Sequence, residues 1–248
     1  QPSNDELLID KLKPMAKQIS EVVYEAGPTG YKLVRAMRGA KLNAQVIAPS
    51  ETPEKKGRRS KDDKRDCRKL AEYACKDLLK RIYVPTLQEE ADRQVTRIRE
   101  AMRKKLQRTK CQIKSFFLLN GICEPDGVSG FARRGITALR ELELNTELRF
   151  VLDRLLDDYE HQYVQMKKCF VKLKELAASD RHREAVEHMR SVTGVGLITA
   201  VTMRTELPNP ERFDRPEEVT AMIGFVPQRI RSGNQEFDGP IEKMGNSH

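Results

Sequence analysis

The sequence predicts a protein of the α/β plus α class. Two short β-rich segments flank a helical segment near the start of the chain, long apolar stripes with helical spacing fill the middle, and shorter helical segments follow. At 248 residues the chain is long enough for one or two domains with real cores. We place the region boundaries at residues 1–86, 87–180 and 181–248, and expect the last region to be small and all-helical.

Charge and cysteine content narrow the function and the compartment. Charged residues make up 33% of the chain and the formal net charge is +9, which favours a polyanionic partner such as nucleic acid. The five cysteines include no C-x-x-C pair, which argues against a zinc ribbon or a disulfide framework and fits a reducing compartment. No apolar run approaches the roughly 18–20 residues that span a bilayer. The chain begins Gln-Pro-Ser and stops at Gly-Asn-Ser-His, so we expect it to be truncated at both ends.

The first region is predicted to begin with a helix and to continue as strand, helix and strand. Asn4 can cap a helix from Asp5 to about Leu12, which Pro14 ends. Residues 18–24 are rich in β-formers, residues 31–40 are helical, and residues 44–48 form a second strand that Pro49 stops. Short connections between these segments predict a right-handed βαβ unit with parallel strands.

Residues 58–69 set acidic side chains inside one of the most basic windows of the chain. A helix that starts near Asp62 or Asp63 and runs to about Ile82 would place Asp63 and Asp66 on one face, where their charges repel. Neighbouring basic side chains, or a divalent metal with oxygen ligands, could offset that repulsion. On this window alone, a solvated helix start with aspartates favoured by the helix dipole is the simpler interpretation.

Two long amphipathic helices are predicted over residues 87–120 and about 137–178, joined by a loop at 121–130. Their apolar side chains advance by threes and fours, so we expect an antiparallel hairpin or coiled-coil arm in which the stripes serve packing. The first helix also carries a basic face with few balancing acids, made of Arg93, Arg97, Arg99, Arg103, Lys104, Lys105, Arg108 and Lys110. Such a charge run is usually a solvated face, and nucleic-acid contact is the alternative.

The third region contains a glycine-rich turn and a serine between an arginine and a glycine. Residues 191–200 have the shape of a helix-hairpin-helix turn, where Gly194 and Gly196 would let backbone amides hold a phosphate; a plain helix connection is the alternative. Pro216 opens another helix, which ends near Ile223. Residues 224–234 form a short extended piece that enters a polar loop. Ser232 in this piece could attack a phosphodiester, although a lone serine is far more often only a loop residue.

Several stretches together resemble one family. Residues 24–30, Y-E-A-G-P-T-G, resemble the E-A-T-G strand end of the DEDD transposases, and residues 61–71 resemble their K-x-D-x-x-D-A-x-x-L-A helix start. V-T-G-V-G at 192–196, G-F-V-P at 224–227, R-S-G at 231–233 and K-M-G-N at 243–246 are similar to their C-terminal domain. The order matches along nearly the whole chain. The chain therefore resembles the "one-ten" group of bacterial insertion-sequence transposases, which includes the Piv-like DNA invertases.

The resemblance implies a partial ribonuclease H-like (RuvC-like) domain, a coiled-coil insertion and a small helical transposase domain. In the family, four acids bind magnesium and a serine attacks DNA to form a covalent phosphoserine link. By position, Glu25, Asp63 and Asp66 match three of the acids, with Mg²⁺ or Mn²⁺ as cofactor, and Ser232 matches the nucleophile. The residues then expected to contact nucleic acid are Lys61, Lys64, Arg65, Gly194, Gly196, Arg229 and Arg231. The resemblance also implies a structured guide RNA, a homo-oligomer (dimer or tetramer) and a place in the bacterial cytoplasm, at the nucleoid.

Departures from the family pattern limit the expected site. The family's first aspartate lies on a strand upstream of anything present here, so the expected metal site lacks its fourth acid, and the family's C-terminal helices are missing too. Pro240 stands where a basic residue is common, and Glu242 where a hydroxyl is common. The leading hypothesis is a DNA transposase or site-specific recombinase that uses Ser232 and Mg²⁺. The alternatives are a metal nuclease that forms no covalent intermediate, and an inactive nucleic-acid-binding remnant.

Overall fold

The computed structural model describes residues 5–49, 52, 63–125, 131–232 and 235–241, but not the side chains of residues 228–232 and 235–238. The chain divides into two compact units, Gln1–Thr86 and Leu87–His248. Across the described ranges, every helix is too short or too polar to cross a membrane. All five cysteines lie in these ranges as free thiols.

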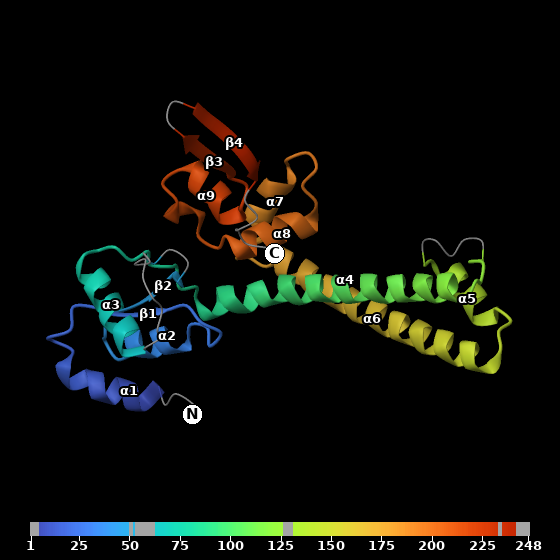
Figure 1. Ribbon diagram of the computed structural model, residues 1–248, viewed down its shortest axis with the longest axis horizontal. Helices are drawn as coiled ribbons and strands as arrows, with labels where there is room; N and C mark the ends of the chain where they lie inside the picture. The colour runs from blue at the N-terminus through green and yellow to red at the C-terminus, as the bar shows by residue number, and fades with distance from the viewer. Residues whose placement is uncertain (1–4, 50–51, 53–62, 126–130, 233–234, 242–248) are drawn as a thin grey trace. The chain divides into compact units, whose positions relative to one another are not determined.

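The first unit is built on a parallel strand pair (Figure 1). β1 (Val22–Glu25) pairs with β2 (Ala44–Ile47), with Val22 opposite Ala44, and α2 (Lys32–Gly39) connects the two strands. The predicted strand–helix–strand unit is therefore confirmed. β1 starts later than the predicted residue 18 because the amides of residues 18 and 19 donate to the carbonyl of Met15, at the end of the short helix η1 (Lys13–Met15).

The alternating side chains of β2 fix what covers each face of this strand pair. Ala44 and Val46 are buried against Val34 of α2 and Ile9 of α1 (Asp5–Leu12). On the other face, Ile47 is buried against Tyr73 and Leu79. Tyr73 belongs to α3 (Asp63–Cys75), so α2 and α3 lie on opposite faces of the strands.

The helix predicted to run to Ile82 is wrong in its second half, because α3 ends at Cys75. Asp77 adopts a left-handed conformation with φ of 53°, and the amide of Leu78 donates to the Tyr73 carbonyl. Residues 80–82 then run antiparallel beside β2, where the Ile82 amide donates to the Val46 carbonyl at 2.8 Å. Pairing with β2 outweighs the local helical preference of this stretch, which the sequence pattern alone does not reveal.

The second unit contains an arm of two long helices, α4 (Leu87–Leu119) and α6 (Thr146–Ala178) (Figure 1). The helices run antiparallel, since Thr109 donates to Asp158 near one end and Val95 packs in the same cluster as Leu173 near the other. The core of the arm is apolar and includes Leu106, Ile113, Phe117, Leu152 and Leu156. The predicted antiparallel hairpin is confirmed; whether its packing is that of a coiled coil stays a prediction.

The second long helix was predicted as one element from about residue 137 and is in fact two, α5 (Arg133–Glu141) and α6. Asn145 caps α6, its side chain accepting from the Leu148 amide at 2.8 Å. The Arg149 guanidinium donates to the carbonyls of Leu139, Arg140 and Leu142, which satisfies the end of α5. A capping asparagine inside an apolar periodic stretch was the available signal for this break.

The remaining elements of the second unit are α7 (Arg183–Arg190), α8 (Leu197–Glu206), the short helix η4 (Pro210–Arg212), α9 (Pro216–Ile223), β3 (Pro227–Ser232) and β4 (Gln235–Ile241). α7 and α8 pack against the start of α4 and the end of α6. α9 matches its predicted bounds. The region is not all-helical as predicted, since β3 and β4 form an antiparallel pair. The Gly-Asn dipeptide between these strands is a two-residue hairpin signal that was interpreted only as a polar loop.

Candidate functional site: an acidic cavity and a glycine turn

A cavity of about 700 Å³ lies between β1 and α3 in the first unit. Its walls are mainly apolar, from Val22, Leu70 and their neighbours. The three acids singled out from the sequence, Glu25, Asp63 and Asp66, all line it, although Glu25 is far from the other two along the chain. Their appearance on one cavity follows from the packing of α3 against β1.

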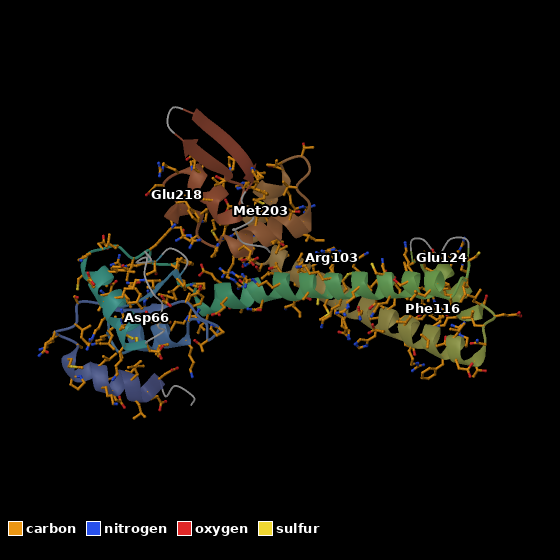
Figure 2. All side chains as sticks on the ribbon, in the orientation of Figure 1. Asp66, Arg103, Phe116, Glu124, Met203 and Glu218 are labelled. Carbon is orange, nitrogen blue, oxygen red and sulfur yellow. The ribbon has the colours of Figure 1, made fainter. Side chains whose placement is uncertain are left out.

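Each acid lies at the end of an element. Glu25 is the last residue of β1, and Asp63 and Asp66 occupy the first turn of α3 (Asp66 is labelled in Figure 2). The three residues are exposed to solvent. The positive end of the helix dipole favours carboxylates in a first turn, so the two aspartates suit this position with or without a ligand.

The donor set is partly suited to a metal ion. Three carboxylates facing one cavity are the hard oxygen ligands that Mg²⁺ and Mn²⁺ prefer. Within the described ranges, however, no group of three or more His, Cys, Asp or Glu side chains is gathered closely enough to hold a metal. The chemistry of the donors fits a divalent ion, while their spacing does not.

The basic residues predicted beside the acids are only partly described. Lys64 and Arg65 are exposed on the first turn of α3, and neither lines the cavity. Lys61, together with Asp62, lies outside the described residues. The structure therefore brings the three acids together but does not bring Lys64 and Arg65 into the same cavity.

The cavity wall includes residues that sequence reasoning missed. Glu21 lines it and is held by Arg81, whose Nε donates to Glu21 Oε1 at 2.8 Å. Tyr24 lines it too, and its hydroxyl accepts from the Val34 amide at 3.2 Å. Burial raises the pKa of Tyr24, with the Val34 hydrogen bond opposing the shift, so the hydroxyl stays neutral at physiological pH. Their closeness to Glu25 in sequence was the one signal available.

The glycine turn of the second unit joins two helices that pack on each other. Gly194 has a φ of 91°, and Gly196 is the N-cap residue of α8. Both are exposed, and a Cβ at either position would meet nothing within 4 Å. The first amides of a helix have no partner within it, so those at the start of α8 can donate only to groups outside the helix. This geometry suits a phosphate but equally suits a plain connection.

A buried polar cluster ties α7 and α8 to α4. Asp92 of α4 accepts hydrogen bonds from Gln88, Arg181 and His182, the last at 2.8 Å between Asp92 Oδ2 and His182 Nε2. Burial raises the pKa of Asp92, but the hydrogen bonds from His182, Gln88 and Arg181 outweigh it, so the net shift is downward. No sequence signal marked Asp92 as more than a charge on an amphipathic helix.

A second contact in the cluster corrects the predicted basic face. Arg97 donates to both carboxylate oxygens of the buried Glu206 at 2.9 and 3.0 Å, and Arg93 donates to the Thr205 carbonyl. Arg93 and Arg97 therefore hold α8 against α4 and are not part of a solvated face. Helical spacing could not show this, because it does not say which neighbour covers a face.

The predicted nucleophile lies in β3. The extended piece predicted from residue 224 is confirmed only from Pro227 to Ser232, because Gly224 ends α9 in the left-handed conformation. Ser232 is opposite Gln235 in the strand register, with Arg231 opposite Glu236. The side chains of Ser232, Arg229 and Arg231 lie outside the described part of the chain. Ser232 belongs to the second unit and the three acids to the first.

Two family models match the chain. One, described as "Transposase IS116/IS110/IS902 family", matches residues 186–248, and a transposase model of the DEDD IS110 type matches residues 3–123. Together they cover most of the sequence and include all four predicted catalytic residues. The chain is thus of the transposase class. Within that class it belongs to the IS116/IS110/IS902 family.

Individual relatives agree with this assignment. A protein of Sinorhizobium fredii named "Putative transposase y4qE" is 31% identical over 224 residues, covering 90% of this chain and 54% of the relative. The transposase for insertion sequence element IS1533 of Leptospira borgpetersenii is 29% identical, covering 84% and 61%. The transposase for insertion sequence element IS1111A of Coxiella burnetii is 25% identical, covering 91% and 61%. The chain therefore spans between about half and two thirds of the length of these relatives.

Proposed function

We propose that the chain belongs to the machinery of a mobile element and acts on DNA, cutting and rejoining strands through a covalent bond to Ser232. The observation that carries this proposal is the single cavity lined by Glu25, Asp63 and Asp66. These acids come from two elements that sequence analysis had linked only through a family pattern. Their gathering in a chain of the IS116/IS110/IS902 family supports a catalytic role over a solvated helix start.

In this proposal the serine performs covalent catalysis. The Ser232 oxygen attacks phosphorus and forms an O–P bond, while the bond between phosphorus and one deoxyribose oxygen breaks. The departing oxygen takes up the proton that the serine hydroxyl loses and leaves as a hydroxyl. The phosphoserine link keeps the phosphodiester energy for rejoining. Family resemblance assigns Mg²⁺ or Mn²⁺ to Glu25, Asp63 and Asp66, whose spacing in the structure does not hold an ion, so metal binding would require these carboxylates to move together and a further ligand to join them.

Nucleic-acid contacts complete the proposal. The first amides of α8, which follow the exposed Gly194–Gly196 turn, suit a DNA phosphate, because a helix start combines donors that lack partners within the helix with a positive dipole end. Lys64 and Arg65 beside the acids, and Arg229 and Arg231 beside the serine, add positive charge. Guidance by a structured RNA and assembly into a dimer or tetramer are parts of the same proposal that rest on family resemblance.

The serine role is tested by trapping a protein–DNA adduct on a duplex that carries the element's end. Ser232→Ala should abolish the adduct, and Asp63→Asn should lower both adduct and strand cleavage. An adduct of unchanged yield in Ser232→Ala would refute the serine role. Cleavage that survives Ser232→Ala but not Asp63→Asn would instead support a metal nuclease in which water attacks.

An inactive nucleic-acid-binding remnant is the second candidate, because no described group of side chains is gathered closely enough to hold a metal. Calorimetric titration with Mg²⁺ and Mn²⁺ separates the two. The remnant predicts weak metal binding that Asp66→Asn leaves unchanged. Tight binding that is lost in Asp66→Asn would exclude the remnant and support the catalytic proposal.

A further inference from the structure

One side of α4 is strongly basic beyond the point where α8 covers it. Between residues 100 and 119 the helix contains a single acid, Glu100, and several lysines and arginines. At 3.6 residues per turn, Arg93, Arg97, Lys104 and Arg108 fall within about 60° of one another around the helix axis. They therefore belong to one side of α4.

Contacts at the start of α4 identify that side. Arg93 and Arg97 both meet Glu206 at the end of α8, and Thr96 meets Thr205 at 3.2 Å. The side that α8 covers at the start of α4 therefore continues outward as Lys104 and Arg108. In Figure 1, α7 and α8 stand against the first half of α4, and the helix runs on beyond them with α6 alongside.

Lys104 and Arg108, here called the arm stripe, are charged and available. Both are exposed, and within the described ranges neither makes a hydrogen bond or an ion pair through its side chain. Glu100 is already engaged by Arg103 at 2.7 Å. The nearest α6 acid in the contacts of this segment, Asp158, is engaged by Thr109 and Gln162. Glu100 lies one turn before Lys104 and attracts it, but Glu100 also pairs with Arg103 and Arg99, so positive charge exceeds negative charge along this side of α4.

We infer that the arm stripe binds the phosphate backbone of the same DNA duplex that the Gly194–Gly196 turn holds. The inference rests on the proposed function. At 1.5 Å rise per residue, Lys104 and Arg108 lie about 10 and 16 Å beyond Arg97 along α4. Because α8 is only 10 residues long and its far end contacts Arg97, its glycine turn begins about 15 Å from that contact, a distance comparable to the span of the stripe. Duplex DNA carries one charge per about 1.7 Å of axis, so a segment along the arm offers the stripe several phosphates.

The chain offers a matched control in Lys105. It is exposed and lies next to Lys104 in sequence, but is rotated by about 100° away from the side that α8 covers. Lys105→Gln therefore removes the same charge from the same helix turn without touching the stripe. A general loss of electrostatic attraction would affect both lysines equally.

The test measures binding of a 30-base-pair DNA duplex by fluorescence anisotropy at several salt concentrations. Each lost phosphate contact should reduce the slope of log K against log salt by about 0.9. We expect Lys104→Gln/Arg108→Gln to reduce the slope by about twice that amount and Lys105→Gln to leave it unchanged. Gly194→Val, at the turn, should weaken DNA binding both in the unmodified chain and in Lys104→Gln/Arg108→Gln.

The outcomes separate this inference from the proposed function. Equal effects of Lys104→Gln and Lys105→Gln would refute DNA binding by the arm stripe. An unchanged slope in Lys104→Gln/Arg108→Gln, while Gly194→Val still weakens binding, would also refute it but would leave DNA binding by the turn in place. Loss of affinity only for an RNA duplex of the same sequence would overturn the DNA assignment in favour of RNA. An unmodified chain that binds no DNA would overturn both proposals.

Discussion

Replacing Asp92 should loosen the start of α7 from the arm. Asp92 is 5% exposed and accepts hydrogen bonds from a cationic arginine, a buried histidine and a glutamine. Asp92→Asn removes the charge and turns an amide donor towards groups that themselves donate. Hydrogen bonds to charged groups contribute about 1.5–3 kcal/mol each, and breaking a buried pair costs about 3–5 kcal/mol. Arg181 is half exposed and regains water, so we expect a loss near the lower end, about 3 kcal/mol.

Hydrogen–deuterium exchange of residues 181–190 measures this loss where it occurs. A change of about 1.36 kcal/mol is tenfold, so about 3 kcal/mol should speed exchange in α7 by about two orders of magnitude. The control is Asp180→Asn, since Asp180 is 95% exposed and makes only a 3.4 Å ion pair with Arg183. Exposed pairs of this kind contribute about 0–1 kcal/mol.

If Asp92→Asn and Asp180→Asn change hydrogen exchange in α7 by the same small factor, Asp92 does not hold α7 on the arm. That result would mean that apolar packing of Val186 and its neighbours alone holds α7 in place. Faster exchange in α7 with unchanged exchange in the middle of α6 would support a local opening of the joint. Faster exchange throughout the second unit would show instead that Asp92 stabilises the whole unit.

Three further predictions concern stability. Because the pKa of Asp92 is lowered on folding, the stabilising effect of its carboxylate should be complete above about pH 5 and should fade as pH falls below about 3.9. Hydrogen exchange in α7, measured as a function of pH, should show this loss of stability. In Asp92→Asn this pH dependence should be absent. Leu156→Ala, at a fully buried position, should lower the free energy of unfolding of the arm by about 2–5 kcal/mol in urea titration, against under about 1 kcal/mol for the 43% exposed Val151→Ala. Gly194→Ala should lower the melting temperature, because its positive φ is strained for a residue with a Cβ, at a cost of about 1 kcal/mol. Gly27→Ala, where φ is not positive and a Cβ would meet nothing within 4 Å, should have almost no effect, and equal shifts would contradict this prediction.

The elements that local pattern specifies could be predicted closely. α2, α9 and β2 match their expected bounds within about one residue. Each has a clear beginning and end in sequence, such as Pro216 in the first turn of α9 and Gly224, with φ of 81°, after it. Glu25, Asp63 and Asp66, which the family pattern marks, line one cavity, and their catalytic and metal-binding roles stay predictions.

The wrong predictions share one physical cause: a residue or strand far away in sequence determines the local structure. Residues 80–82 are extended because β2 pairs with them, and the long second helix is broken because Arg149 and Asn145 stabilise two separate ends. The sequence Gly-Asn is a local signal for the β3–β4 hairpin, but such a dipeptide forms a hairpin turn only where the two flanking segments can pair as strands. Local preference is a weak guide wherever such partners exist.

The basic face of α4 shows the same limit at the level of function. Helical spacing treats Arg97 and Lys104 as equivalent, because they lie on one side of the helix seven residues apart. Arg97 pairs with Glu206 at the end of α8 and so serves packing of the two helices. Lys104 lies beyond the part of α4 that α8 covers and is exposed. A charge run on a long helix therefore changes its role at the point where a neighbouring element ends. For this chain that point lies between Arg97 and Lys104, so substitutions before it should act on folding and substitutions after it on DNA binding.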